Sequence, residues 1–186
     1  MMIYSKSTSE KRKQAQPANT WEEQMEYDCG FKNGNNWFRY RTGGILIHDN
    51  KMLFVKSIFG DYYYMIGGGV HLGETSEKCI EREVFEESGL CVRADHLAVV
   101  CENFFKGDGG TTDGLHCHEI EFYYRMKILD DDPNICRHTT DDGEKLVWLP
   151  LDKISESNIR PSFIKHTIDR IIGGDQIIHV IQNDDK

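Results

Sequence analysis

Three glutamates, Glu83, Glu86 and Glu87, are spaced so that they could share one face of a helix. At about 100° per residue they fall within a sector roughly 100° wide, because offsets of three and four residues return to the same side. Two like charges about 6 Å apart repel by roughly 3 kcal/mol at an effective dielectric of 20, so a multivalent cation would relieve the crowding. Carboxylate oxygens suit a hard ion, Mg²⁺ first and Mn²⁺ second, and Mg²⁺ is commonly held by carboxylates together with substrate phosphates. The stripe therefore predicts a metal platform for a phosphate-bearing ligand.

A short helix that positions these acids is predicted between a capping residue and a glycine stop. Thr75 or Ser76 can cap the free amides at its start, and Gly89 suits the left-handed position after the last turn. We expect the apolar side of this helix to face a sheet and the acids to face a cleft. The apolar residues are Ile80 and Val84, flanked by Cys79 and Phe85.

A glycine-rich turn at residues 67–69 precedes this helix and follows a strand predicted over 62–66. Missing side chains allow unusual backbone angles and a close approach to a ligand, so the carbonyl of Gly67 could point at the metal. Within the helix, Arg82 could bridge to Glu74 or to one of the acids. An ordinary surface ion pair would contribute no more than about 1 kcal/mol. In this setting we expect Arg82 to orient an acid instead.

Turn and helix together resemble the Nudix box, G-x5-E-x7-R-E-U-x-E-E-x-G-U, in which U is a bulky aliphatic residue. A charged, solvated helix after a glycine turn would also be rich in glutamate, but it would not be expected to match every fixed position. The flanking stretches GGILI and MLFVK before the box and LVWLPLDKI after it extend the similarity over roughly residues 38–172. The matching positions are Gly68, Glu74, Arg82-Glu83-Val84, Glu86-Glu87 and Gly89-Leu90.

The resemblance implies a Nudix-type α/β/α sandwich with a mixed β-sheet. It implies hydrolysis of a nucleoside diphosphate linked to a further group X, with Mg²⁺ as cofactor and Mn²⁺ as a possible substitute. The base that takes a proton from water would be Glu83 or a later carboxylate, and both options stay open. By the same resemblance the metal ligands are Glu83, Glu86, Glu87 and the Gly67 carbonyl, Arg82 and Glu74 are the supporting pair, and Glu144 is a further catalytic carboxylate with Asp141 and Asp142 as rivals.

The substrate is less well defined by the sequence. Ile66 stands where many members of the family have proline before the glycines. Markers of ADP-ribose, dinucleoside polyphosphate and NADH hydrolases are missing, which favours a (d)NTP or a modified nucleotide. The alternatives are an ADP-ribose or nucleotide-sugar pyrophosphatase, a nucleotide-sensing module without turnover, a diphosphate isomerase and a structural or partner-binding protein.

Bulk properties set limits on the rest. The chain has 186 residues, of which 39% are hydrophobic. We therefore expect one domain at residues 21–186, preceded by a flexible extension at residues 1–20. A net charge of −9 argues against binding to nucleic acid or to an anionic membrane surface. No apolar run is long enough to span a bilayer and no signal peptide is evident, so a cytoplasmic protein is expected. A homodimer is possible by the resemblance.

The remaining pattern predicts strands more than helices. A hairpin over Trp21 to Arg41 turns at residues 33–36, and a glycine-rich loop at 106–114 is expected to flank the cleft. Among the aromatics of the long strand 116–128, one of Phe122, Tyr123 and Tyr124 could stack on a base, although packing is the commoner role. In that strand Glu119 has no evident partner. Further strands are predicted at 44–48, 52–55, 97–101, 146–149 and 177–181, and a helix at 161–172.

Overall fold

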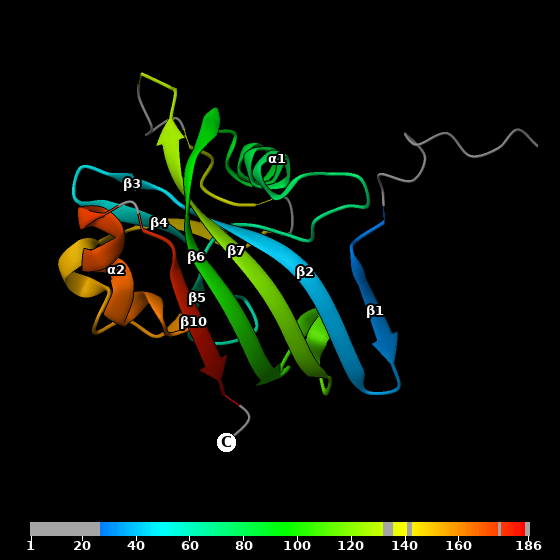
Figure 1. Ribbon diagram of the computed structural model, residues 1–186. Coiled ribbons are helices and arrows are strands. Elements are labelled where there is room, and N and C mark those ends of the chain that lie inside the picture. Colours follow the sequence, from blue (N-terminus) through cyan, green and yellow to red (C-terminus); the bar gives the residue numbers. More distant parts are fainter. Residues whose placement is uncertain (1–26, 132–135, 141–142, 175, 185–186) are drawn as a thin grey trace, which may run out of the picture.

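The computed structural model describes residues 27–131, 136–140, 143–174 and 176–184, and these form two sheets and two α-helices (Figure 1). The predicted extension at residues 1–20 lies outside the described residues. So do residues 21–26 of the predicted hairpin. The single-domain boundary at residue 21 therefore stays a prediction.

The first sheet has the strand order β1-β2-β7-β6-β10. Strand β2 runs parallel to β7, β7 antiparallel to β6, and β6 parallel to β10, so the sheet is mixed. The β1–β2 hairpin is the predicted one, with Asn33 opposite Asn36 and Gly34 at a φ of +58° in the turn. The strands are β1 (Gly30–Asn33), β2 (Asn36–Ile45), β6 (Val92–Lys106), β7 (His116–Ile128) and β10 (Ile178–Asn183).

The second sheet is centred on β4, which pairs with three neighbours. Strands β3, β5 and β8 are all antiparallel to β4, and β9 continues the sheet beyond β5 in parallel. Its strands are β3 (Ile47–His48), β4 (Lys51–Lys56), β5 (Tyr63–Tyr64), β8 (Lys145–Pro150) and β9 (Ile159–Arg160).

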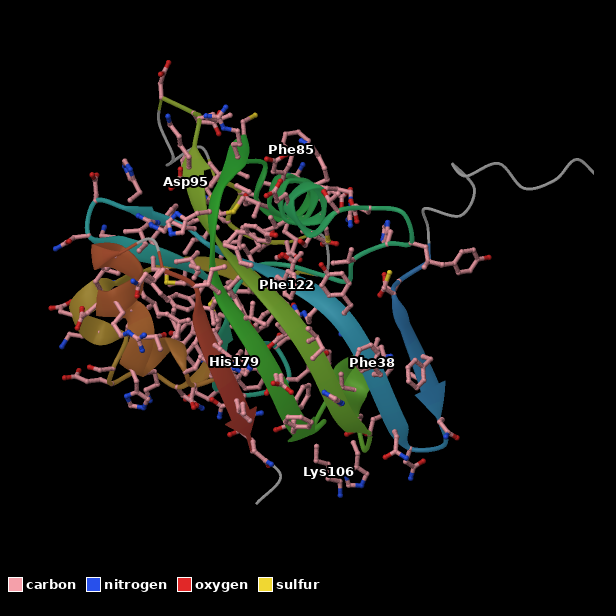
Figure 2. All side chains as sticks on the ribbon, viewed as in Figure 1. Phe38, Phe85, Asp95, Lys106, Phe122 and His179 are labelled. Carbon is pink, nitrogen blue, oxygen red and sulfur yellow. The ribbon has the colours of Figure 1, made fainter. Side chains whose placement is uncertain are left out.

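Two hydrophobic cores lie on opposite sides of the strand layer, and each is closed by one helix. Because successive strand residues point to opposite faces, Ile45 and Phe54 pack with helix α2 (Ile164–Gly173), while Leu46 and Leu53 pack with helix α1 (Ser76–Ser88). The predicted α/β/α sandwich with mixed strands is thus confirmed, with the strands divided between two sheets. Figure 2 shows Phe38 and Phe122 on the face of the first sheet that carries α1.

Helix α1 has the predicted ends. Thr75 accepts a hydrogen bond from the Lys78 amide as N-cap, and Gly89 takes the left-handed conformation with a φ of 75°. Ile80 and Val84 are fully buried, whereas Phe85 is half exposed and points to solvent (Figure 2). The acids are therefore left on the opposite side, as the periodicity required.

Several predicted elements have different bounds, and strand β6 and helix α2 are the clearest cases. Strand β6 continues past the predicted end at Cys101 to Lys106, because β7 pairs with it along its full length. Helix α2 begins at Ile164 rather than Pro161, because Arg160 is still paired in β9 and the chain turns before the helix starts.

No helix in the described part of the chain is both long and apolar enough to cross a bilayer.

Candidate active site

A cavity of about 770 Å³ opens between the two sheets, beside α1. Five of the residues singled out from the sequence line it, although they come from the glycine turn, from α1 and from the segment before β8. They are Gly67, Glu83, Glu86, Glu87 and Glu144.

The glycine turn lies closely against its surroundings, which explains why it lacks side chains. Gly67 has a φ of +150°, and a Cβ there would lie 2.1 Å from the carbonyl oxygen of Thr42. A Cβ on Gly68 would lie 2.3 Å from a carboxylate oxygen of Glu83, so this acid rests directly on the turn. Either substitution would displace backbone or a candidate metal ligand.

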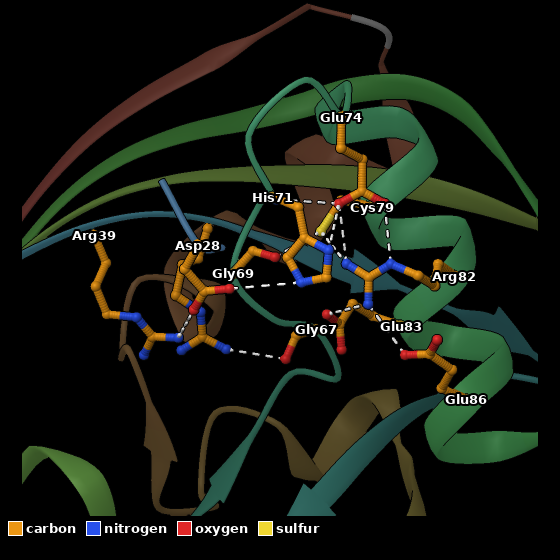
Figure 3. A network of polar contacts seen from close by, with 11 residues as sticks. Asp28, Arg39, Gly67, Gly69, His71, Glu74, Cys79, Arg82, Glu83 and Glu86 are labelled. Carbon is orange, nitrogen blue, oxygen red and sulfur yellow. Dashed lines mark hydrogen bonds and ion pairs between the residues drawn. The ribbon is translucent and has the colours of Figure 1, made fainter. Parts of the chain in front are cut away.

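Arg82 joins the supporting acid to the acids of the helix (Figure 3). Its Nε and Nη2 donate to the two carboxylate oxygens of Glu74 at 2.9 and 3.0 Å, a bidentate pair. Its Nη1 donates to Glu83 at 2.7 Å and to Glu86 at 3.0 Å. Although burial acts to raise it, hydrogen bonds from Arg82 and from the His71 amide hold the pKa of Glu74 below its usual value. The sequence predicted that Arg82 bridges either to Glu74 or to one of the helix acids. In the structure Arg82 contacts Glu74 and two helix acids, Glu83 and Glu86.

Glu144 lines the same cavity as the helix acids, from the segment just before β8. Its carboxylate accepts hydrogen bonds from the Tyr64 hydroxyl and, at 3.3 Å, from the Ile58 amide. The residue is only 8% exposed. Burial and then Glu144 raise the pKa of the Tyr64 hydroxyl, so Tyr64 stays a donor to Glu144 at neutral pH. We call Glu83, Glu86, Glu87 and Glu144 the acidic wall.

A second charged cluster, not anticipated from the sequence, forms the bottom of the cavity. Arg39 donates to Glu119 at 3.3 Å, and Arg41 lies 3.8 Å from Glu119 and 3.9 Å from Glu121. Asn103, on the neighbouring strand β6, lies directly opposite Glu119 in the sheet. All five line the cavity, and we call Arg39, Arg41, Asn103, Glu119 and Glu121 the buried floor.

The floor carboxylates are almost completely shielded from solvent. Glu119 is 1% and Glu121 is 2% exposed. Burial and the neighbouring Glu119 raise the pKa of Glu121 to about 7, while Arg41, Tyr123 and Asn103 act to lower it. Burial by itself would lower the pKa of Arg41, but Glu119 and Glu121 raise it above its ordinary value. The floor is therefore a low-dielectric cluster whose members depend on one another.

The surroundings of several other residues named from the sequence can be described. Gly67 offers its carbonyl to Arg41, whose Nη2 donates to it at 3.2 Å. None of Phe122, Tyr123 and Tyr124 lines the cavity, since these rings pack in the cores or against Tyr40. Glu119 has arginine partners, and Asp141 and Asp142 lie outside the described residues. The aromatic rings that do line the cavity are those of Phe59, Tyr62, Tyr64 and Phe105.

The donor chemistry of the wall fits a hard divalent cation, because every candidate ligand is an oxygen. In the arrangement described for residues 27–184 outside the gaps, no three His, Cys, Asp or Glu side chains converge closely enough to hold an ion. Glu83 and Glu86 are instead turned toward Arg82. Glu86 is more than half exposed, so it can change rotamer at small cost.

Known proteins share both the sequence pattern and the fold. The model of the NUDIX domain family matches residues 37–169. A MutT-like protein of Streptomyces ambofaciens is 27% identical over 115 residues, or 62% of this chain and 65% of that protein. An RNA pyrophosphohydrolase of Acinetobacter baylyi is 36% identical over 66 residues, or 35% of this chain and 39% of that protein. The chain thus spans less than two thirds of either relative.

The fold also resembles that of a solved structure. The crystal structure of a NUDIX hydrolase from Nitrosomonas europaea superposes with a TM-score of 0.59 at 18% identity, covering 78% of this chain and 79% of that one. The matched residues 37–169 include the glycine turn, all of α1 and the acidic wall. On this match, the chain belongs to the NUDIX domain family.

Proposed function

We propose that this protein hydrolyses a phosphoanhydride bond in a nucleoside diphosphate linked to a further group X, using Mg²⁺ or Mn²⁺. The observation that carries the proposal is the acidic wall, where four carboxylates from two separate parts of the chain line one cavity. A polyanionic substrate would be repelled by such a wall alone. It can bind there only together with cations, which is the arrangement that metal-assisted phosphoryl chemistry uses.

Glu83, Glu86 and Glu87 are the residues that would hold the ion, with the Gly67 carbonyl as a further oxygen. When bound, such an ion neutralises charge on the phosphate oxygens and lowers the pKa of a coordinated water. Arg82 is placed to orient Glu83 and Glu86, since its other two nitrogens are fixed by the bidentate pair with Glu74. The exposed Arg82–Glu86 contact is the one that exchanges most easily for a cation.

The proton of the attacking water would go to Glu83 or to Glu144. Glu83 is fixed by the glycine turn and by Arg82, and Glu144 by Tyr64 and the Ile58 amide. Each is thus held in one orientation, as a general base requires. The base is the residue whose change to glutamine removes the acidic limb of the pH–rate profile.

As substrate we propose a (d)NTP, in which X is phosphate, or a modified nucleotide. The name of the Streptomyces relative agrees with a MutT-type activity. The name of the Acinetobacter relative, an RNA pyrophosphohydrolase, adds RNA as a substrate class, but the net charge of −9 opposes a long polyanion. ADP-ribose and nucleotide sugars are the alternative class.

The test is hydrolysis of a panel with Mg²⁺, with Mn²⁺ and with excess chelator, and separation of the products by chromatography. The panel contains (d)NTPs, 8-oxo-dGTP, ADP-ribose, dinucleoside polyphosphates, nucleotide sugars and a triphosphorylated RNA oligonucleotide. Cation-dependent cleavage of one class identifies both reaction and substrate. Nucleotide binding without cleavage would instead favour a sensing module, and rearrangement of an isoprenoid diphosphate without phosphate release would favour an isomerase.

A further inference from the structure

The face of the first sheet that carries α1 has a groove of its own, on the opposite side of the sheet from the buried floor. Helix α1 packs over Tyr124 and Met126 near the end of β7. Figure 1 shows this helix at the upper end of the face, away from the lower parts of β2 and β7. Beside those lower parts the groove has a volume of about 440 Å³, and we call it the apolar groove. Its lining includes Phe31, Phe38, Tyr40, Ile120 and Phe122.

Four rings form a row beside the apolar groove, because the strand register places them next to one another. Phe31 is paired with Phe38 in the hairpin, and their rings stack with centroids 5.4 Å apart. His118 of β7 lies beside Phe38, with its ring edge-on at 5.4 Å. His118 also stacks on Phe104 of β6 at 4.4 Å. We call these four residues the aromatic row, and it ends at β1, an edge strand of the sheet.

The aromatic row has contacts still to make beyond those with the described residues. Phe31 is 65% exposed. The Nε2 atom of His118 is shielded from solvent, yet it makes no hydrogen bond to any described residue. An unpaired buried polar atom is costly, and a continuous exposed apolar patch marks an interaction surface. The groove has a polar border, since Glu102 points to this face, away from the buried floor, and pairs with the exposed His179 at 2.8 Å.

The chain enters β1 next to this groove, and its entry point is fixed by backbone hydrogen bonds. The Tyr27 carbonyl accepts from the Leu72 amide at 2.8 Å, and the Cys29 amide donates to the Val70 carbonyl at 2.7 Å. Phe31 follows Tyr27 by four residues, which is about 13 Å of extended chain. Six extended residues span up to about 20 Å, so a side chain at position 21 can reach back to the aromatic row.

Residues 21–26 have the composition that such a groove requires. Trp21 and Met25 are four residues apart, a spacing that returns to the same side of a helix and of a strand alike. An indole ring stacks on other aromatic rings, and a thioether makes favourable contacts with them. The indole N–H is also a hydrogen-bond donor, which a neutral His118 can accept at Nε2. The other residues of the segment are hydrophilic: Glu22, Glu23, Gln24 and Glu26.

We propose that residues 21–26 of the same chain cover the apolar groove, with Trp21 against the aromatic row. A second copy of the chain could also bury such a face, but the two occupants differ in concentration. A segment joined to its site by a few residues has an effective concentration in the millimolar range, about a thousandfold above that of a protein at micromolar concentration. The segment is therefore the favoured occupant. The globular domain then begins at Trp21, and this conclusion does not depend on the proposed hydrolysis.

The test is quenching of tryptophan fluorescence by acrylamide in the full chain. The chain has three tryptophans, Trp21, Trp37 and Trp148. The contribution of Trp21 is the difference between each protein and the same protein carrying Trp21→Phe. A docked Trp21 should have a quenching constant several-fold below that of N-acetyltryptophanamide. It should also emit at a shorter wavelength than this reference, because its indole ring is removed from water.

Two variants of the groove are compared with a matched variant elsewhere. Phe31→Ser removes a mostly exposed ring, and Phe38→Leu keeps an apolar side chain but shortens the aromatic row. Phe85→Ser is the control, because Phe85 is 52% exposed and points to solvent from α1. The quenching constant of Trp21 should rise several-fold in Phe31→Ser, rise less in Phe38→Leu and stay unchanged in the control. Thermal unfolding checks that each variant is folded, and Phe38→Leu decides the test if Phe31→Ser is not.

Shielding of Trp21 that is independent of protein concentration and is lost in the groove variants supports the proposal. Three other results would overturn it. A Trp21 that is quenched as readily as the reference is not docked, and this result needs no groove variant. Shielding that survives unchanged in the groove variants would place Trp21 elsewhere. Shielding that is lost on dilution, together with a change from dimer to monomer in light scattering, would show that a second copy covers the groove.

Discussion

Arginine pairs with glutamate both at the acidic wall, where Arg82 lies beside it, and within the buried floor, but the two sets of pairs differ in distance and in burial. Beside the wall, Arg82 makes hydrogen bonds of 2.7 to 3.0 Å, yet the side chain of Glu86 is more than half exposed. On the floor, the arginine–glutamate distances are longer, 3.3 to 3.9 Å, yet Glu119 and Glu121 are shielded from solvent. The pairs with the shortest distances are therefore not the pairs whose partners are best shielded from solvent.

Burial rather than distance decides what each cluster can do. An exposed pair contributes about 0 to 1 kcal/mol and is easily exchanged, so the wall can give up an arginine contact for a cation. A buried charge that loses its partner costs about 3–5 kcal/mol. The floor is thus fixed in place, which suits recognition, and the wall is adaptable, which suits a site that binds and releases metal and phosphate.

The largest expected effect on stability comes from Glu119→Ala. This change leaves Arg39 and Arg41 without their shared carboxylate, and the free energy of unfolding should fall by about 3–5 kcal/mol. Chemical denaturation measures it, with Glu86→Ala as the exposed counterpart, for which the loss should stay below about 1 kcal/mol. Equal losses in the two variants would remove the distinction between floor and wall.

The next largest effect is expected in the pH dependence of stability, to which Glu121 of the floor contributes. The pKa of Glu121 is raised to about 7 from its usual 4.5, so the folded protein binds more protons than the unfolded chain between these values. Stability should therefore fall as pH rises through this window, by up to about 3 kcal/mol from this group. Glu121→Gln should flatten the change relative to Glu102→Gln when unfolding is measured at both ends of the window. Parallel curves for the two variants would contradict the assignment.

A smaller effect on stability is expected from Arg82→Lys, beside the wall. Lysine cannot reproduce the bidentate pair with Glu74, but it keeps the positive charge and Arg82 is only partly buried, so the free energy of unfolding should fall by only about 1 kcal/mol. Turnover should fall by about tenfold to a hundredfold, because Glu83 and Glu86 lose their orientation. A loss of stability without a loss of turnover would show that Arg82 is structural only.

The three helix acids of the wall were predictable from the sequence because their determinants are local. Helix α1, its cap at Thr75, its stop at Gly89 and the spacing of Glu83, Glu86 and Glu87 all lie within one short stretch. The glycines before it are explained by contacts with Thr42 and Glu83 that only the fold reveals. Glu144 could be named only from the resemblance, since nothing local to it marks a site.

The floor could not be predicted because its partners are distant in the chain. Arg39 and Arg41 alternate in β2, and Glu119 and Glu121 alternate in β7, which is typical of one polar face on each strand. Only the parallel register of β2 with β7 brings Arg39 opposite Glu119 and Arg41 opposite Glu121. A shift of one residue in that pairing would bury the neighbouring aromatics instead.

The most direct test of the account is the rate of nucleotide hydrolysis by Glu87→Gln beside the wild-type protein and Glu102→Gln, across a range of Mg²⁺ concentrations. Glutamine keeps the size of Glu87 but removes the charge that the acidic wall offers to a cation. We predict that turnover falls by about two orders of magnitude or more with thermal stability retained, and that Glu102→Gln has no effect. Turnover by Glu87→Gln at the wild-type rate would contradict the assignment of the wall as the catalytic centre.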